Sequence, residues 1–255
     1  MRLVVAALAA AFAVLAGATV GCAPADESDP SEPGEGESVA ALSEAYTAWS
    51  ALADSRGLRA TPGRARVIGL RGQDTAGRLH DTRVARVFDD ALVVLTADGR
   101  AVTLAASTHP WETSSPHSPD VDGDGAGDVG MLAPGRYLAV ARPASRDIAG
   151  LPTWHVLTTG AVDGLPGARN TDHDAVYSDA ERAASSRRGD KLTAILFHKG
   201  GEGAPAAIGC QVLDAAGVKK LAALVAGRDR FDYLLIDAAT LGDGAVALPK
   251  LPPPG

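Results

Sequence analysis

Between residues 60 and 245, short apolar runs alternate with polar turns, which is the pattern that β-strands produce. The runs are rich in Val, Leu and Ile, and Gly residues or Asp-Gly pairs separate them. Strands are expected within the segments 64–72, 82–99, 100–108, 135–143, 153–160, 191–200 and 230–237. The pattern therefore predicts one mainly β domain, a sandwich or a mixed sheet, over residues 60–245.

Apolar residues at helical spacing occur in only a few segments. Residues 39–57 carry such a pattern, which predicts an amphipathic helix that ends at Gly57. Its apolar positions are Val39, Leu42, Tyr46, Trp49 and Leu52. Further helices are expected in 214–227 and 181–189, and the Pro-rich tail 246–255 is expected to be extended.

Composition and charge narrow the class of protein. Hydrophobic residues make up 46% and charged residues 22% of the chain, and its 29 Gly and 16 Pro favour a loop-rich β fold. The net charge is −7, and no run of Lys and Arg with interleaved aromatic residues occurs. The sequence therefore predicts no nucleic-acid partner.

The N-terminus has the pattern of an export signal. One early positive charge precedes an apolar run that is rich in small residues and too short for a typical transmembrane helix. Residues 1–22 resemble a bacterial lipoprotein signal, which implies lipidation of Cys22 and a membrane anchor in the cell envelope; ordinary cleavage near this point is the alternative. Residues 23–38 are acidic and rich in Pro, Gly and Ser, so they are predicted to be a disordered linker.

Two acidic segments have the spacing of calcium loops. Residues 120–128 read DVDGDGAGD and carry Asp120, Asp122, Asp124 and Asp128. Four carboxylates in so short a loop repel one another unless a cation lies among them, and Gly125 permits the sharp turn. The segment is similar to the nine-residue calcium loops of propeller-type proteins, and a solvated acidic turn is the alternative.

The second segment, residues 170–181, is the better match to the twelve-residue loop of an EF-hand. In that pattern the ligands would come from Asn170, Asp172, Asp174, Val176, Ser178 and Glu181. Ala175 replaces the usual Gly, and no helix is expected before the loop. The prediction is a one-sided, structural Ca²⁺ site.

The domain contains a single cysteine, Cys210, because Cys22 belongs to the signal. An unpaired thiol in an exported protein is either a reactive group or a small buried hydrophobe. Gly209 permits an unusual backbone angle beside the sulfur, and His198 ends an apolar strand, where a general base would be held rigidly. These residues predict a cysteine nucleophile with His198 as its base.

The same region resembles the catalytic domain of the L,D-transpeptidases, β-rich peptidoglycan-modifying enzymes with a cysteine nucleophile. In that family a strand ending in His precedes a Ser-His-Gly-Cys motif, and His198, Gly209 and Cys210 match it. Ala207 and Ile208 stand where the family has Ser-His. The segments ASTHPWETSS and LAPGRYLAV resemble its upstream elements, so the resemblance covers about residues 65–236.

This resemblance implies a fold of L,D-transpeptidase type and a thioester mechanism. Cys210 would attack a carbonyl of a peptidoglycan stem peptide, and His198 would take the thiol proton. The N–H groups of Gly209 and Cys210 would hold the oxyanion. An amine would then resolve the thioester in a transpeptidase, and water would do so in a carboxypeptidase.

Three classes of function fit these features. The favoured one is an exported thiol acyltransferase or peptidase that acts on the cell wall. The alternatives are a non-enzymatic, calcium-stabilised lipoprotein that binds the wall or a partner, and a different cysteine hydrolase. A zinc site formed by Cys210, His198 and His155 is a less favoured possibility. The remaining histidines, His80, His109, His117 and His173, are interpreted as loop residues.

Overall fold

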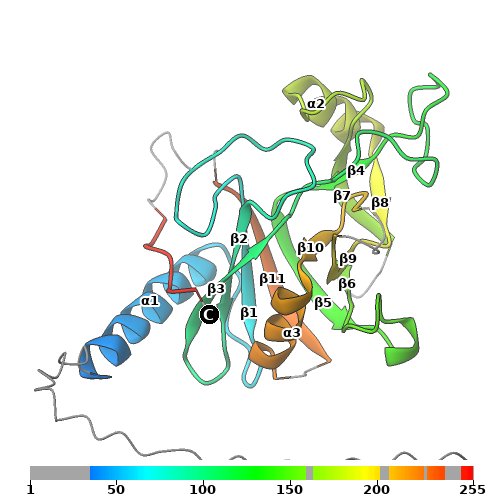
Figure 1. Ribbon diagram of the computed structural model, residues 1–255. Coiled ribbons are helices and arrows are strands. Elements are labelled where there is room, and N and C mark those ends of the chain that lie inside the picture. The colour runs from blue at the N-terminus through cyan, green and yellow to red at the C-terminus, as the bar shows by residue number, and fades with distance from the viewer. Residues whose placement is uncertain (1–34, 159–162, 202–206, 227–228, 239–247, 255) are drawn as a thin grey trace, which may run out of the picture. The chain divides into compact units, whose positions relative to one another are not determined.

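The computed structural model describes residues 35–158, 163–201, 207–226, 229–238 and 248–254, with side chains from residue 43 onward (Figure 1). All of these residues belong to one compact unit, Glu35–Gly255. The predicted signal peptide with Cys22, and the predicted linker up to residue 34, lie outside the described residues. None of the described helices is long and apolar enough to cross a membrane.

Most of the described strands form one large mixed sheet. In spatial order these are β10 (Gln211–Leu213), β9 (Leu196–Lys199), β6 (Trp154–Leu157), β5 (Gly135–Ala141), β11 (Arg230–Asp237), β1 (Arg66–Arg71), β2 (Asp90–Leu95) and β3 (Ala101–Ala106). β1 runs parallel to β11, and β9 runs parallel to β10. A backbone pair between Ser107, just after β3, and Val212 of β10 links the outermost strands, so the sheet nearly closes on itself.

A smaller sheet and the helices complete the described part of the chain. The smaller sheet contains β4 (Gly130–Leu132), β7 (Asp163–Arg169) and β8 (Lys191–Thr193). The helices are α1 (Glu35–Ser55), α2 (Asp179–Arg188) and α3 (Ala215–Leu224), and a short 3₁₀ turn, η1, spans Ala144–Arg146. Figure 1 shows α2 beside the smaller sheet and α1 and α3 beside the larger one. The described residues are mainly β, as the sequence pattern predicts.

The central strands are buried on both faces. Every residue of β1 and β2 is buried. Val67 of β1 belongs to a cluster that contains Val218 of α3, whereas the next residue, Ile68, packs in a cluster with Trp49 and Leu52 of α1. Strands covered on both sides need apolar residues at successive positions, which explains why these segments read as continuous apolar runs.

Helix α1 is longer at its start than the apolar pattern predicts. It begins at Glu35, within the segment 23–38 that was expected to be disordered, and it ends at Ser55, before Gly57. Acidic residues near a helix start interact favourably with the helix dipole, which explains how the helix extends into the acidic segment. The apolar face is confirmed where side chains are described, because Trp49 and Leu52 are buried.

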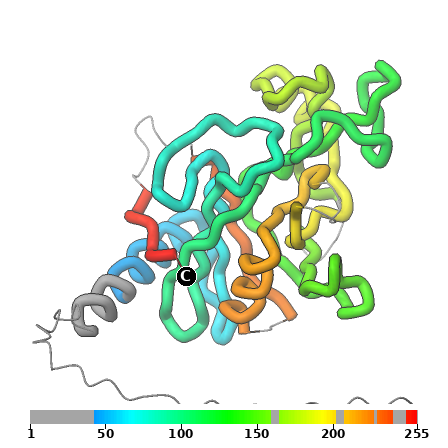
Figure 2. Tube along the Cα trace, in the orientation of Figure 1, coloured from blue at the N-terminus to red at the C-terminus, as the bar shows by residue number. Residues whose placement is uncertain are grey.

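The described part of the Pro-rich tail lies along α1 and β3 (Figure 2). Trp49 Nε1 donates a hydrogen bond to the Lys250 carbonyl oxygen at 2.9 Å. Thr103 of β3 donates from its N–H to the Pro253 carbonyl at 3.2 Å and from its hydroxyl to the Pro252 carbonyl at 2.8 Å. The tail therefore supplies acceptors to an edge strand, and proline prevents it from serving as a full pairing strand itself.

Three strands are absent from the pattern-based prediction. β4 and β10 are each only three residues long. β7 has the sequence DGLPGAR, in which Gly and Pro hide the strand signal. The strands that the pattern predicts are confirmed, and so is the helix in 214–227. The helix expected over 181–189 is α2.

Candidate functional site

The thiol and the imidazole predicted to react together come from the neighbouring parallel strands β9 and β10. In their register, His198 pairs with Val212 and Phe197 pairs with Gln211. Cys210 immediately precedes β10 and packs in the same cluster as Val212. Because side chains two residues apart in a strand point to the same face, Cys210 and His198 share one face of the sheet with an offset of two positions.

Burial keeps both groups uncharged at neutral pH. Cys210 is 8% exposed, and burial raises the pKa of its thiol to about 11. His198 is 2% exposed, and burial lowers the pKa of its imidazole. The thiol makes its described hydrogen bond to the Ala194 carbonyl oxygen at 3.9 Å and not to His198. At rest the pair is therefore a thiol and a neutral base rather than a thiolate and an imidazolium.

The tautomer of His198 suits a base. Its Nδ1 lies 2.8 Å from the Lys199 carbonyl oxygen. A carbonyl only accepts hydrogen bonds, so Nδ1 carries the proton and Nε2 carries the lone pair. Nε2 is therefore the atom of His198 that could accept the thiol proton.

Gly209 has the unusual backbone angle that its position before the cysteine suggests. Its φ is +119°, a value that residues with a side chain rarely adopt. A Cβ atom at this position would collide with the carbonyl oxygen of Gly130 in β4. Glycine therefore allows the cysteine loop to approach the smaller sheet closely.

A small cavity of about 150 Å³ opens beside the thiol. Its lining residues include Cys210, Ile208, Ala194, His117 and Arg169. Ile208 gives this part of the cavity wall an apolar side chain.

A buried cation also lines this cavity. Arg169 is 6% exposed, and its terminal nitrogens donate to the carbonyl oxygens of Asp128 at 3.0 Å and Lys191 at 2.6 Å. Its Nε has no hydrogen-bond acceptor, and no carboxylate forms an ion pair with it among the described residues. Burial lowers the pKa of Arg169, and the nearby carboxylates of Asp190 and Asp128 offset part of this effect without a direct ion pair, so this wall of the cavity carries a positive charge.

The first acidic loop brings its carboxylates together. Oxygen atoms of Asp120, Asp122 and Asp124 all lie within 4.8 Å of one another. Both oxygens of Asp120 accept backbone N–H groups, from Gly123 at 2.6 Å and from Gly125 at 3.0 Å, and these bonds lower its pKa. The loop is therefore shaped by its own backbone, and three carboxylates converge on one point.

Asp128 forms the buried end of this loop. Its side chain is fully buried, and Oδ2 accepts the Val121 N–H at 2.6 Å. Oδ1 has no hydrogen-bond donor among the described residues, although His173 Nε2 lies 3.6 Å away. Burial and the negative charges of Asp122 and Asp120 raise the pKa of Asp128. The charge on this carboxylate would be stabilised by a nearby cation.

The second acidic loop uses its glutamate differently. Glu181 is buried; its Oε1 accepts the N–H of Thr171 at 2.7 Å, and its Oε2 accepts the N–H of Ser178 at 2.8 Å. With Ser178 it forms a capping box at the start of α2. Asp172 and Asp174 accept N–H groups within the loop. Three acidic side chains do not converge here in the described structure as they do in the first loop.

Two other proposed ligands of the second loop, Asn170 and Val176, both contact Asp174. Asn170 is fully buried, and its amide donates to the Asp174 carbonyl at 2.8 Å, while its Oδ1 has no donor among the described residues. Val176 is exposed, and its N–H donates to Asp174. His173, at the loop tip, reaches Asp124 of the first loop with 3.2 Å between Nε2 and Oδ2. The two acidic loops are therefore neighbours.

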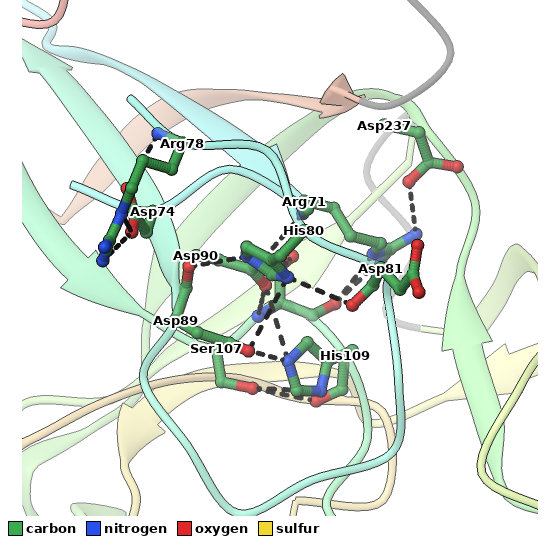
Figure 3. Close-up of polar contacts among 12 residues, drawn as sticks. Arg71, Asp74, Arg78, His80, Asp81, Asp89, Asp90, Ser107, His109 and Asp237 are labelled. Carbon is green, nitrogen blue, oxygen red and sulfur yellow. Dashed lines mark hydrogen bonds and ion pairs between the residues drawn. The ribbon is translucent and has the colours of Figure 1, made fainter. Parts of the chain in front are cut away.

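A third group of titratable residues lies where the β1–β2 connection meets the ends of β2 and β3 (Figure 3). It contains His80, Asp89, Asp90 and His109, and we call it the histidine–aspartate cluster. Asp90 and His109 are buried, whereas His80 and Asp89 are partly exposed. The sequence interpretation placed both histidines in loops and did not join them to these acids. The signal that could have found it is the Asp-Asp pair immediately before the apolar run of β2.

Ser107, His109 and Asp89 contact one another in the order of a hydrolase triad. Ser107 Oγ lies 3.5 Å from His109 Nδ1, and His109 Nε2 lies 2.9 Å from Asp89 Oδ1. The serine is fully buried and its hydroxyl already bonds to the His109 carbonyl and to Trp111 Nε1. This hydroxyl is inaccessible to a substrate, so the arrangement is not a nucleophilic site.

The zinc site considered for Cys210, His198 and His155 is not formed by the described residues. His155 of β6 pairs with Leu196 of β9, so strand β9 lies between His155 and Cys210. The groups of possible metal ligands that converge in the described structure do not include these three residues.

Comparisons with known proteins give no match. No family model, no curated protein and no solved structure is similar to this chain.

Proposed function

We propose that the protein is an exported cysteine acyltransferase or peptidase with a fold of L,D-transpeptidase type, which acts on peptidoglycan stem peptides. The observation that carries this proposal is the common sheet face of Cys210 and His198, beside a cavity that Arg169 lines. A nucleophile, a base and an oppositely charged contact for substrate are the minimum that acyl transfer needs.

Because Cys210 and His198 are both uncharged at rest, the first chemical step must move a proton from the thiol to the imidazole. His198 Nε2 takes the Sγ proton as the sulfur attacks the substrate carbonyl, and the N–H groups of Gly209 and Cys210 stabilise the oxyanion. The carbon–nitrogen bond then breaks, and the imidazolium gives its proton to the departing amine. A second amine, or water, attacks the resulting thioester and restores the thiol. A thiol whose pKa is about 11 requires this concerted proton transfer, because little thiolate exists beforehand.

Substrate charge follows from the cavity. Arg169 has donor capacity left at its Nε and no carboxylate partner among the described residues. An acyl donor that carries a carboxylate near the scissile bond would add a negatively charged partner for this side chain. Stem peptides end in such a carboxylate, which supports the substrate class.

Calcium is proposed at the first acidic loop. Asp120, Asp122 and Asp124 converge, and the buried Asp128 presents an oxygen without a hydrogen-bond donor. Oxygen ligands at this spacing suit Ca²⁺, which would stabilise the loop against the repulsion of its own charges. The second loop stays a predicted site, because Glu181 serves as a helix cap in the structure.

The calcium proposal is tested by thermal unfolding with EDTA or with excess Ca²⁺. Chelation should lower the melting temperature by several degrees, since an ion that binds only the folded state stabilises it. Asp124→Asn should remove this difference, and Asp172→Asn should preserve it. A difference that disappears only in Asp172→Asn would move the ion to the second loop.

The proposed location is the bacterial cell envelope, with a lipid anchor at Cys22. The apolar N-terminal run that ends at this cysteine supports export. Mass spectrometry of the full chain after expression in a bacterial host would detect a lipid-modified Cys22.

One observation favours a second candidate function. The thiol is 8% exposed, its pKa is raised, and Ala207 and Ile208 replace the polar Ser-His pair. These features fit a calcium-stabilised lipoprotein that binds the cell wall without catalysis.

Intact-protein mass spectrometry with tetrapeptide muropeptides separates the two functions. The wild type should form an adduct of the acyl fragment with loss of the terminal residue. Cys210→Ala should form none, His198→Ala should form it far more slowly, and His155→Asn serves as the matched histidine control. Tight binding of the muropeptide without any adduct would favour the binding protein.

A further inference from the structure

The histidine–aspartate cluster contains the residues of a metal site and takes no part in the proposed thiol chemistry. Its members come from three segments of the chain: His80 from the β1–β2 connection, Asp89 and Asp90 from the start of β2, and His109 from the segment after β3 (Figure 3). Ligand atoms of His80, Asp89 and Asp90 lie within 4.8 Å of one another.

Backbone carbonyl groups fix the tautomers of both histidines. His80 Nδ1 lies 3.1 Å from the Asp81 carbonyl oxygen, and His109 Nδ1 lies 3.2 Å from the Pro110 carbonyl oxygen. Both Nδ1 atoms must therefore carry a proton, which leaves Nε2 of each ring as the potential ligand. A ring N–H that donates to a carbonyl is the usual outer-sphere support of a metal-binding histidine.

Both Nε2 atoms face oxygen atoms that have no proton to donate. His80 Nε2 lies 2.8 Å from the Asp89 carbonyl oxygen and 3.6 Å from Asp90 Oδ1. His109 Nε2 lies 2.9 Å from Asp89 Oδ1 and 3.9 Å from Asp90 Oδ2. A bare lone pair would repel these oxygens, so a proton or a metal ion at each nitrogen is favourable. Two protons or one divalent ion would remove this repulsion and neutralise the two carboxylates.

The distances between the candidate ligand atoms are compatible with one divalent ion bound among them. Separations of 2.9 to 3.9 Å between the Nε2 atoms and the carboxylate oxygens lie around the ligand–ligand distance of about 3.3 Å that zinc bonds of about 2.0–2.1 Å produce in a tetrahedral site. Imidazole and carboxylate ligands without thiolate suit Zn²⁺ and neighbouring transition-metal ions.

The cluster is rigid on one side and accessible on the other. Asp90 is fully buried, and its oxygens accept the N–H of Gly72 at 2.7 Å and both the N–H and the hydroxyl of Thr108 at 2.7 Å. The side chains of His80 and Asp89 are 24% and 36% exposed. A prearranged buried ligand with partly exposed partners gives an ion both a fixed position and an entry path.

We propose that His80, Asp89, Asp90 and His109 bind one divalent transition-metal ion of the zinc type, through Nε2 of each histidine and the two carboxylates. The site holds together the long β1–β2 connection and the ends of β2 and β3. This proposal is independent of the proposed acyltransferase function, and neither depends on the outcome of the other.

The experiment is a zinc titration of chelator-treated protein by isothermal calorimetry, in saturating Ca²⁺ to fill the acidic loops. The chain carries Cys210→Ala, so the thiol cannot serve as a ligand. We expect one zinc per protein. His80→Ala and Asp89→Asn should weaken affinity by more than about 100-fold, the upper range for loss of an outer-sphere partner. Asp81→Asn, an exposed acid beside His80, and His117→Ala serve as matched controls and should bind as the parent does.

Cobalt substitution and nitrogen NMR provide a second readout in the same parent chain. Co²⁺ should give visible absorption bands of nitrogen and oxygen coordination, which Asp89→Asn abolishes without changing the far-ultraviolet circular dichroism. Zinc binding that is equal in the parent, His80→Ala and Asp89→Asn would overturn the proposal. The absence of zinc uptake, with Nε2 of both histidines protonated at pH 7.5, would overturn it equally and establish the two-proton alternative.

Discussion

The thiol site and the histidine–aspartate cluster contain histidines in opposite electrostatic environments. His198 is buried beside the Lys199 carbonyl, and burial together with the positive charge of Arg142 lowers its pKa. His80 also loses hydration on burial, which lowers its pKa, but hydrogen bonds to the Asp81 and Asp89 carbonyls and the carboxylates of Asp89 and Asp90 raise it overall. The comparison teaches that burial favours the neutral form of His198, whereas the carbonyls and carboxylates around His80 favour a positive charge on its ring.

The thiol site and the histidine–aspartate cluster are connected by residues that contact both. The backbone of Ser107 pairs with Val212, which packs with Cys210, and its hydroxyl lies beside His109. Trp111 donates to that hydroxyl and packs in the cluster that includes the thiol. The cluster is therefore placed to hold the closing edge of the sheet in position behind the thiol site.

The largest expected effect is loss of the buried carboxylate of the cluster. Asp90→Ala removes the acceptor of three donors from Gly72 and Thr108, which would remain buried and unpaired. We expect the free energy of unfolding in EDTA to fall by about 3–5 kcal/mol. Urea denaturation provides the measurement, and Asp98→Ala, at an exposed aspartate, should change little. A loss below about 1 kcal/mol would mean that the donors find other partners.

The reactivity of the Cys210 thiol should reflect its burial, in contrast to the charged surroundings of the histidine–aspartate cluster. With a pKa of about 11 against about 8.5 for free cysteine, Cys210 has about 300-fold less thiolate at pH 7, so it should react with iodoacetamide far more slowly. The thiolate fraction grows as pH rises, so the rate should increase up to about pH 11. Alkylation rates followed by mass spectrometry from pH 6 upward measure this profile, with the urea-unfolded protein as reference. A plateau near pH 8 would show a solvated thiol.

A smaller effect is expected at the contact between the cysteine loop and β4. Gly209→Ala should destabilise the fold by about 1–3 kcal/mol, because the backbone angle is unfavourable and Cβ would meet the Gly130 carbonyl. Gly63→Ala, at a φ of +70° with open space around it, measures the cost of a left-handed backbone angle without a collision. Equal unfolding free energies for the two variants would show that the loop moves away without cost.

The sequence predicts local features well and long-range contacts poorly. Apolar runs identified β1, β2 and β11 because these strands are buried on both faces. β7 was missed because its Gly and Pro residues form a strand only through pairing with β4 and β8. The pairing of Cys210 with His198 was expected from the resemblance, but the parallel pairing of β9 and β10 was not predicted, because β10 is only three residues long and gives no pattern.

The candidate sites show the same limit. The acids of the first loop are close in sequence, and three of the four, Asp120, Asp122 and Asp124, converge in the structure, whereas Asp128 is not part of that group. Glu181 has the spacing of a calcium ligand, yet the same spacing suits a capping box, and sequence cannot separate the two uses. The histidine–aspartate cluster joins residues from three segments, so only the folded chain reveals it.

The smallest expected effect distinguishes the charge of the cavity from the chemistry of the thiol. Arg169→Gln should reduce the rate of acyl-enzyme formation at low concentrations of donor about tenfold, since a hydrogen bond to a charged group contributes about 1.5 kcal/mol at the lower end. The loss should concern KM more than kcat, because Arg169 lines the cavity without touching the thiol proton. Arg187→Gln, at an exposed arginine of α2, controls for net charge.

Comparing donors with a free and an amidated terminal carboxylate completes the test. Arg169→Gln should lower the rate for the free acid only, because the amide never uses the cation; an equal loss for both donors would assign Arg169 a structural role in the wall of the cavity.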